Sequence, residues 1–258
     1  MRRSDTHPYL DAPRPLAISH RGFAVDGDEN SLAAFQRAVD LGYRYLETDV
    51  HATRDGVVVA FHDATLDRVT DQRGRVRDLD FRALSGARIA GRELIPTLEE
   101  MLASWPEVRF NIDVKAAQAV RPLVEVLRRA RCFHRVCVAS FSERRLTAVR
   151  RLAGPQLATS LGPRGTAALR AVASGRLPRW ALPRAGVCAQ VPERAGPVRV
   201  VDERMVRTAH AAGLQLHAWT VNDPGDMHRL LHLGVDGIVT DRADLLRDVL
   251  RARGVWAS

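Results

Sequence analysis

The sequence predicts a (β/α)8 barrel, because strand and helix patterns alternate along it and eight short apolar runs can serve as barrel strands. Repeated strand and helix units imply parallel strands joined by helical crossovers. Polar residues stand where several of these runs end, and active groups gather at the carboxyl ends of barrel strands. A doubly wound open sheet is the alternative, but no GxGxxG motif follows the first strand.

The first strand and helix are predicted from spacing and a capping residue. Residues 16–20 form an apolar run, and Ser31 can cap a helix whose apolar positions recur at helical spacing until Leu41 and Gly42. The next run, 45–50, is followed by the turn Asp55–Gly56 and a second apolar stretch, 57–63. Asp-Gly between two apolar strands predicts a hairpin.

Residues 64–93 interrupt this rhythm, since they are rich in Asp, Arg and Gly and show little periodicity. We interpret them as a small insertion after the second strand region that passes over a site.

From Thr97 onward strand and helix patterns alternate regularly. The remaining barrel strands are expected at residues 110–115, 136–140, 157–161, 185–191, 214–221 and 237–241. Helices are expected at residues 97–104, 118–131, 142–153, 164–174, 202–212, 224–233 and 243–252.

Length and composition predict one domain over residues 1–258, since 258 residues with 46% apolar content can bury one substantial core. The formal net charge of +9 suits an anionic partner, whether a phosphate ester, a membrane surface or a nucleic acid. Nucleic acid is the minor interpretation, because the arginines are scattered and aromatic residues make up only 5% of the chain. No oligomeric state is predicted.

Cysteine usage and the N-terminal stretch favour a cytoplasmic protein. Cys132, Cys137 and Cys188 are odd in number and lack zinc-site spacing, so we expect buried free thiols in a reducing compartment. The stretch MRRSDTHPYLDAPRP has no apolar core of a signal peptide, and no run reaches the roughly 20 apolar residues of a spanning helix. We therefore expect no stable membrane anchor.

Three carboxylates are candidate ligands of a divalent metal ion. Alternate residues of a strand face the same side, so Glu47 and Asp49 point together, and Asp113 shares a face with Asn111 and Lys115 on a neighbouring strand. Carboxylates placed side by side repel each other unless a cation lies between them. Mg²⁺ or Ca²⁺ could be that cation, although ion pairs with nearby arginines are the usual fate of such groups.

His20 and His62 are candidate acid and base groups, because each lies at the end of an apolar run and two imidazoles that titrate near neutrality can share the two duties. A lone histidine is more often satisfied by a backbone carbonyl. Lys115 is the only lysine among 39 cationic residues. It and Arg21 are either plain counter-ions or ligands for a phosphate group. Trp219 either fills the barrel or walls a substrate pocket.

An ordered set of short motifs runs along most of the chain. The motifs are HRG at 20–22, DENS at 28–31, ETDV at 47–50, TRDG at 53–56, FHD at 61–63, LDRVT at 66–70, NIDVK at 111–115, and HAWTVND with GVDGIVTD near the end. With these motifs, residues 16–250 resemble the glycerophosphodiester phosphodiesterase family.

This resemblance implies a TIM barrel that converts glycerophosphodiesters to an alcohol and glycerol 3-phosphate. It implies that His20 and His62 act as general acid and base. It further implies that Glu47, Asp49 and Asp113 bind one divalent metal ion, and that Arg21 and Lys115 hold the phosphate. Asp113 stands where the family often has a glutamate.

Two other functions stay open at this stage. A lysophospholipase D-like enzyme would keep the chemistry but act on lysophospholipids at a membrane surface, although the sequence shows no amphipathic anchor or lipidation signal. A non-catalytic phosphate-binding or nucleic-acid-binding barrel would not require two histidines and three carboxylates.

Overall fold

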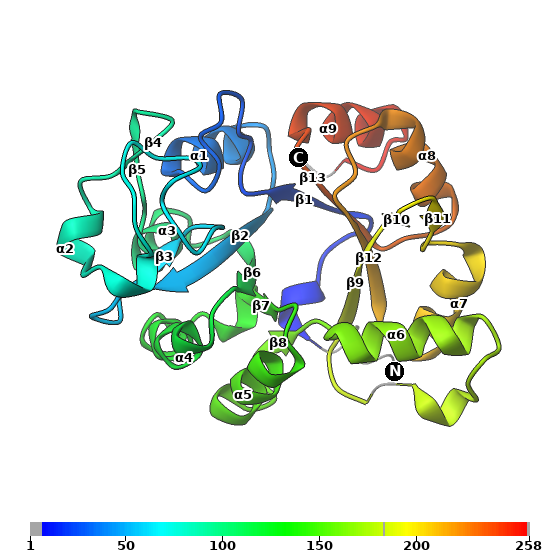
Figure 1. Cartoon of the computed structure of the whole chain (residues 1–258). Coiled ribbons are helices and arrows are strands. Elements are labelled where there is room, and N and C mark those ends of the chain that lie inside the picture. The colour runs from blue at the N-terminus through cyan, green and yellow to red at the C-terminus, as the bar shows by residue number, and fades with distance from the viewer. Residues whose placement is uncertain (1–6, 183, 257–258) are drawn as a thin grey trace.

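Eight parallel strands form a barrel surrounded by helices (Figure 1), which confirms the predicted (β/α)8 class. The computed structural model describes residues 7–182 and 184–256, so Arg2 and Arg3 of the N-terminal stretch lie outside the described residues. The barrel strands are β1 (Leu16–His20), β2 (Tyr45–Ala52), β6 (Arg109–Val114), β7 (Val136–Ala139), β8 (Ala158–Thr159), β9 (Cys188–Pro192), β12 (Gln215–Trp219) and β13 (Gly237–Thr240).

Hydrogen bonding joins the barrel strands in the order β8, β7, β6, β2, β1, β13, β12, β9. Each neighbouring pair is parallel. An isolated parallel bridge between Ser160 and Cys188 joins the two end strands, β8 and β9, and completes the circle. The barrel therefore has one weak seam.

The helices lie within two residues of their predicted bounds, because apolar spacing and, for several of them, a capping side chain are local features of the sequence. They are α1 (Leu32–Asp40), α3 (Leu98–Ser104), α4 (Val120–Arg129), α5 (Glu143–Ala153), α6 (Pro163–Ala173), α7 (Glu203–Ala211), α8 (Pro224–His232) and α9 (Ala243–Ala252). Ser31 caps α1 by accepting a hydrogen bond from the Ala34 backbone, and Thr97 and Glu100 form a reciprocal capping box on α3.

Several strands are shorter than the sequence predicted, and two of them are shorter by more than half. The run 157–161 contributes only the two residues of β8, because the chain changes partners there: Ser160 N donates to Val138 O, and Leu161 N donates to Cys188 O. The run 57–63 forms β3 (Val58–Ala60), which pairs with β2 as the predicted hairpin. His62 therefore lies just beyond the strand rather than at its end.

The insertion is more ordered than its sequence suggested, which corrects the expectation of an irregular segment. Residues 64–93 contain a 3-10 turn (Val76–Asp78), α2 (Phe81–Leu84) and β4 (Arg88–Ile89), which pairs with β5 (Glu93–Leu94). They enclose a small apolar cluster that includes Leu66, Val76, Leu84, Ile89 and Phe61. These apolar residues are too irregularly spaced to give a periodic pattern. Figure 1 places α2, β4 and β5 at one edge of the molecule.

A short N-terminal segment closes the barrel at the end where the strands begin. Tyr9, in the 3-10 turn Pro8–Leu10, is fully buried and packs edge-to-face on Tyr45 with 5.4 Å between ring centroids. The Tyr45 hydroxyl donates to the backbone oxygen of Tyr9 at 2.7 Å. The interior apolar cluster here also contains Cys137 and Cys188.

The three cysteines are buried free thiols, as the sequence predicted. In the part of the chain that the structure describes, no helix is long and apolar enough to cross a membrane.

Candidate active site

The three candidate carboxylates line one pocket at the carboxyl ends of the strands. Glu47 and Asp49 alternate along β2 as predicted, and Asp113 on β6 lies opposite Asp49 in the parallel register. All three side chains are buried. The pocket encloses about 490 Å³, a volume ordinary for a small-molecule site.

Lys115, directly after β6, pairs with two of these carboxylates. Its Nζ lies 2.8 Å from Asp49 Oδ1 and 2.7 Å from Asp113 Oδ2. Burial lowers the pKa of Lys115, but the charges of the two carboxylates outweigh burial and raise it. The lysine is therefore an ammonium ion, and in this structure it is the counter-ion of both groups.

Arg21 contacts the other oxygen of the Asp49 carboxylate. Its backbone adopts the left-handed region (φ 54°), so that its amide donates to Glu47 Oε2 at 3.2 Å while its Nε forms an ion pair with Asp49 Oδ2 at 2.9 Å. Its Nη1 donates to Glu29 Oε1 at 3.0 Å. Both predicted phosphate ligands are thus paired with carboxylates.

His20 is held by carboxylates near both ring nitrogens. Nδ1 lies 2.6 Å from Asp241 Oδ1, and Nε2 lies 3.8 Å from Glu47 Oε2. Burial raises the pKa of Asp241, but the hydrogen bond and charge of His20, together with Asn222 and Arg21, outweigh burial and lower it, so the Asp241 carboxylate accepts the Nδ1 proton. Burial lowers the pKa of His20, but Glu47 and Asp241 together raise it. Nε2 of His20 can therefore exchange a proton with a molecule bound in the pocket.

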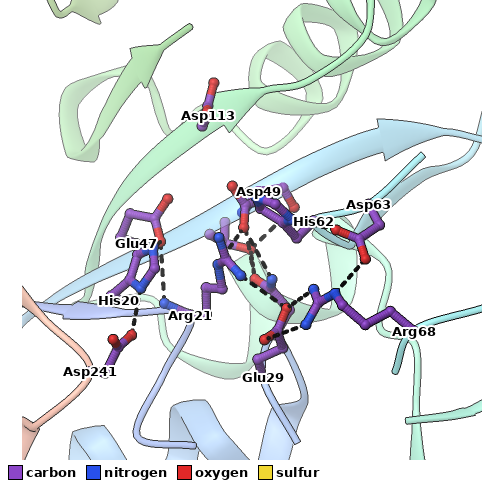
Figure 2. Close-up of polar contacts among 12 residues, drawn as sticks. His20, Arg21, Glu29, Glu47, Asp49, His62, Asp63, Arg68, Asp113 and Asp241 are labelled. Atoms are coloured by element: carbon purple, nitrogen blue, oxygen red, sulfur yellow. Dashed lines mark hydrogen bonds and ion pairs between the residues drawn. The ribbon is translucent and has the colours of Figure 1, made fainter. Parts of the chain in front are cut away.

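His62 has the same arrangement on its own side of the pocket. Its Nδ1 lies 2.6 Å from Asp63 Oδ1, and Arg68 Nε donates to the other oxygen of Asp63 at 2.5 Å. Arg68 Nη2 donates to Glu29 Oε1 at 2.6 Å, which links the insertion to the loop after β1. Figure 2 shows this chain of contacts, with Arg68 between Asp63 and Glu29 and with His20 between Glu47 and Asp241. Both histidines therefore present Nε2.

The side of the pocket away from the carboxylates is mainly apolar. Trp219 lines the pocket there, which is the second of its two interpretations, and meets Phe141 edge-to-face with 5.6 Å between ring centroids. Phe141 is 63% exposed, so it stands at the rim. Leu161, Ala167 and Val200 continue this wall, and Arg170 is its one charged member.

The pKa values of the three carboxylates shift in different directions, because burial and the nearby positive charges act on them unequally. Burial, and then the charge of Asp49, raises the pKa of Glu47 to about 8. Burial also raises the pKa of Asp113, whose Oδ1 is buried without a hydrogen-bond partner. Burial acts on Asp49 in the same direction, but Lys115 and Arg21 outweigh it and hold the Asp49 pKa below its usual value. Asp113 thus shares the charge of Lys115 with Asp49, and Glu47 is paired with His20 at 3.8 Å.

The chemistry of this donor set fits a hard divalent cation, because all three groups offer carboxylate oxygens and one buried oxygen is unpartnered. Among the described residues, however, no three His, Cys, Asp or Glu side chains form a group that could hold a metal ion as they stand. Asp113 lies apart from the others in Figure 2. The Lys115 ammonium contacts Asp49 and Asp113 instead.

Four polar residues of this network were not among the candidate site residues, although all four lie within the sequence motifs: Glu29, Asp63, Arg68 and Asp241. Asp241 follows the last barrel strand directly, so its position at a strand end was a usable signal. Asn222 holds it by donating to Asp241 Oδ2 at 2.8 Å.

Comparisons with known proteins identify the family. The family model described as "Glycerophosphoryl diester phosphodiesterase family" matches residues 20–245. A Mycobacterium tuberculosis protein named "Probable glycerophosphodiester phosphodiesterase 2" is 47% identical over 247 residues, which cover 93% of this chain and 92% of that protein.

Solved structures have the same fold. A crystal structure from Silicibacter pomeroyi, of a protein named for glycerophosphoryl diester phosphodiesterase activity, is 25% identical and matches with a TM-score of 0.80 over the full length of both chains. An Oleispira antarctica phosphodiesterase in complex with the product sn-glycerol-3-phosphate is 23% identical, has a TM-score of 0.74, and is matched over 92% of this chain and 97% of that one. The chain belongs to the glycerophosphoryl diester phosphodiesterase family and is a phosphodiesterase that hydrolyses glycerophosphodiesters.

Proposed function

We propose that this enzyme cleaves glycerophosphodiesters by acid–base catalysis with His20 and His62, at a site that also binds one divalent cation. The observation that carries the proposal is the matched orientation of the two imidazoles. Each directs Nδ1 to a carboxylate, Asp241 or Asp63, at 2.6 Å. Each therefore keeps Nε2 for proton transfer in one pocket.

The two histidines divide the proton transfers of the reaction. The Nε2 of one, in its neutral form, takes the proton of the glycerol 2-hydroxyl that attacks phosphorus, and water later opens the resulting cyclic phosphate to give glycerol 3-phosphate. The Nε2 of the other, in its protonated form, gives its proton to the alcohol oxygen as the bond from phosphorus to that oxygen breaks. Asp241 and Asp63 keep each ring in the required tautomer and stabilise its charged form, as a carboxylate does for the histidine of a catalytic triad.

Glu47, Asp49 and Asp113 would hold Mg²⁺ or Ca²⁺, which supplies Lewis-acid stabilisation of the phosphoryl oxygens when bound. The unpartnered Asp113 Oδ1 and the raised pKa of Glu47 support this set. Lys115 and Arg21 would then bind the phosphate, since a cation at the carboxylates removes their need for those counter-ions.

Glycerol 3-phosphate release tests the proposal directly. We expect turnover of glycerophosphocholine and glycerophosphoethanolamine that EDTA abolishes and Mg²⁺ or Ca²⁺ restores. His20→Ala and His62→Ala should each lose about 10²- to 10⁴-fold in kcat, the range for general acid–base groups. His228→Ala is the matched control, because that exposed histidine lies on α8 outside the pocket. A catalytic variant as active as this control, or EDTA-resistant turnover, would contradict the corresponding part of the proposal.

The apolar wall favours a second substrate class, lysophospholipids. Leu161, Ala167 and Val200 offer an acyl chain a surface that a small polar alcohol does not require. In the same assay, Ala167→Asp should lower turnover of lysophosphatidylcholine and leave that of glycerophosphocholine nearly unchanged. Equal loss on both substrates would exclude an acyl-chain role for this wall.

A further inference from the structure

A second cavity lies on the outer surface of the barrel, between the last turn of α6 and α7. It encloses about 480 Å³ and is lined by three arginines, Arg179, Arg204 and Arg207, together with the hydroxyl-bearing Ser174 and Thr208. No acidic residue is among its lining residues. Arg207 pairs with Glu203 at 2.7 Å, while Arg179 and Arg204 have no ion pair among the described residues. The cavity is therefore a concentrated positive site.

An exposed apolar pair stands beside this cavity. After α6 the chain exposes five consecutive residues, from Arg176 to Trp180. Trp180 is 81% exposed and Leu177 is 41% exposed. Four of the five are arginine, leucine or tryptophan, and Arg184 extends the basic character.

The segment is held in place by its ends. The backbone amides of Arg176 and Leu177 both donate to Ala171 O at the end of α6, and Trp180 lies within a 3-10 turn, Arg179–Ala181. The next residue, Leu182, packs against the main core. Figure 1 shows α6 and α7 side by side, and the two helices contact one another. The exposed side chains thus project from a fixed turn.

We propose that this surface, formed by Leu177, Trp180, Arg179, Arg204 and Arg207, docks the enzyme on an anionic phospholipid bilayer. Tryptophan favours the interface between headgroups and acyl chains, where its ring is buried and its N–H stays wet. Arginines beside it gain from the negative surface potential of anionic lipids and pair with headgroup phosphates. An exposed Trp and Leu inside a basic rim have no such benefit in water.

The same features disfavour a nucleic acid as the partner. Single-stranded nucleic acid binds through successive aromatic platforms on which bases stack. This surface offers one aromatic ring, and its second apolar group, Leu177, has no π face. A lipid interface uses both side chains equally well.

Docking here would bring the membrane to the helix that also borders the substrate pocket. Thr166, Ala167 and Arg170 of α6 line the pocket, and Val172 to Gly175, at and just beyond the end of the same helix, line the basic cavity. At about 1.5 Å per residue, only about 3 Å of helix separates Arg170 from Val172. The inference goes beyond the proposed chemistry and does not depend on it.

Vesicle binding by the full-length protein tests the inference. Vesicles of pure phosphatidylcholine are compared with equimolar phosphatidylcholine and phosphatidylglycerol by co-sedimentation. We expect binding to the anionic vesicles only, with a blue shift in tryptophan emission that Trp180→Ser abolishes. Trp180 is suited to this readout because Trp105, Trp219 and Trp256 are all at least partly buried.

Charge-matched variants separate the local surface from net charge. Removing two interfacial arginines in Arg204→Gln/Arg207→Gln should weaken vesicle binding by about 30-fold, since each is worth about 1 kcal/mol at such a surface. Arg121→Gln/Arg144→Gln removes the same charge from exposed positions on α4 and α5, and should change binding by no more than about threefold because distant charges are screened.

Three outcomes would overturn the inference. One is equal binding by the two double variants. Another is wild-type protein that binds neither vesicle type. The third is a single-stranded oligonucleotide that displaces the protein from vesicles and loses affinity in Trp180→Ser, which would assign the surface to nucleic acid. Unchanged glycerophosphocholine turnover in each variant verifies that it is folded.

Discussion

Glu47 links the charge of the pocket to the stability of the whole fold. Its carboxyl is buried beside Asp49, and its pKa is raised to about 8, well above the value of a carboxyl in the unfolded chain. A group whose folded pKa is raised contributes stability that is complete below the unfolded pKa and is lost as pH rises through the folded pKa. The metal-free enzyme should therefore become less stable from about pH 5 to about pH 8.

Thermal unfolding in EDTA at several pH values measures this effect. We expect Glu47→Gln to flatten the decline, because a neutral amide has no charge to desolvate. Added Ca²⁺ should flatten it as well, by favouring the ionised form. Glu125→Gln, at an exposed position on α4, should keep the wild-type profile. If the profiles of wild type and Glu47→Gln ran parallel, burial of Glu47 would not control the pH dependence.

Strand alternation was sufficient to predict which side chains share the pocket, because the side of a strand to which a residue points depends only on its position along that strand. Glu47, Asp49 and Asp113 all face inward as expected. The partner of His20 could not be predicted in the same way, since Asp241 is 221 residues away and only barrel closure brings them together. The same applies to Arg68, which reaches Glu29 from a segment without periodic pattern.

A buried arginine just before β7 holds the end of α3 and the loop that leads from α3 to β6. Arg135, before β7, donates to three backbone oxygens near the end of α3: Leu102 O at 2.7 Å, Trp105 O at 3.1 Å and Val108 O at 2.8 Å. Its guanidinium also lies 5.6 Å from the centre of the Phe110 ring. Leu102 lies in the last turn of α3, and Trp105 O also accepts a hydrogen bond from Val108 N at 3.2 Å.

We expect Arg135→Leu to destabilise the protein by about 2 to 4 kcal/mol, because hydrogen bonds to a charged donor are lost and buried carbonyls are left unsatisfied. Denaturant unfolding measures the change. Arg129→Leu, which removes an exposed arginine paired with Glu99, should cost less than about 1 kcal/mol. A similar small cost for both variants would show that Arg135 does not anchor α3.

Helix positions were predictable because caps and periodicity are local, whereas strand lengths were not. The run 157–161 was predicted as a full strand, yet β8 has only two residues because the chain passes there from hydrogen bonding with Val138 to hydrogen bonding with Cys188. The insertion shows the same limit, since its apolar cluster assembles from residues whose spacing follows no helix or strand period.

The number of backbone pairings between neighbouring strands differs around the barrel. β2 and β6 pair over six registered positions, whereas β8 and β9 meet at one bridge and two neighbouring hydrogen bonds, Leu161 N to Cys188 O and Val187 N to Thr159 O. Local opening follows the least supported part of a structure. This seam borders the apolar wall of the pocket at Leu161.

Hydrogen exchange should find this seam. We expect the amides of Leu161 and Val187 to exchange faster than that of Ile112 in the middle of β6, and ligand binding in the pocket to narrow the difference. Mass spectrometry of peptides from the seam and from β6 compares the two exchange rates. Equal protection at both places would mean that the barrel opens as one unit.

The single lysine gives this protein an unusual chemical handle. A chain of 258 residues with Lys115 as its only lysine carries one ε-amine, and that amine lies in the active site between two carboxylates. Reductive methylation with isotope-labelled formaldehyde would therefore place one lysine side-chain reporter on the molecule, within the catalytic pocket. Its resonance would distinguish an ammonium paired with carboxylates from one released to a phosphate, without any engineered label.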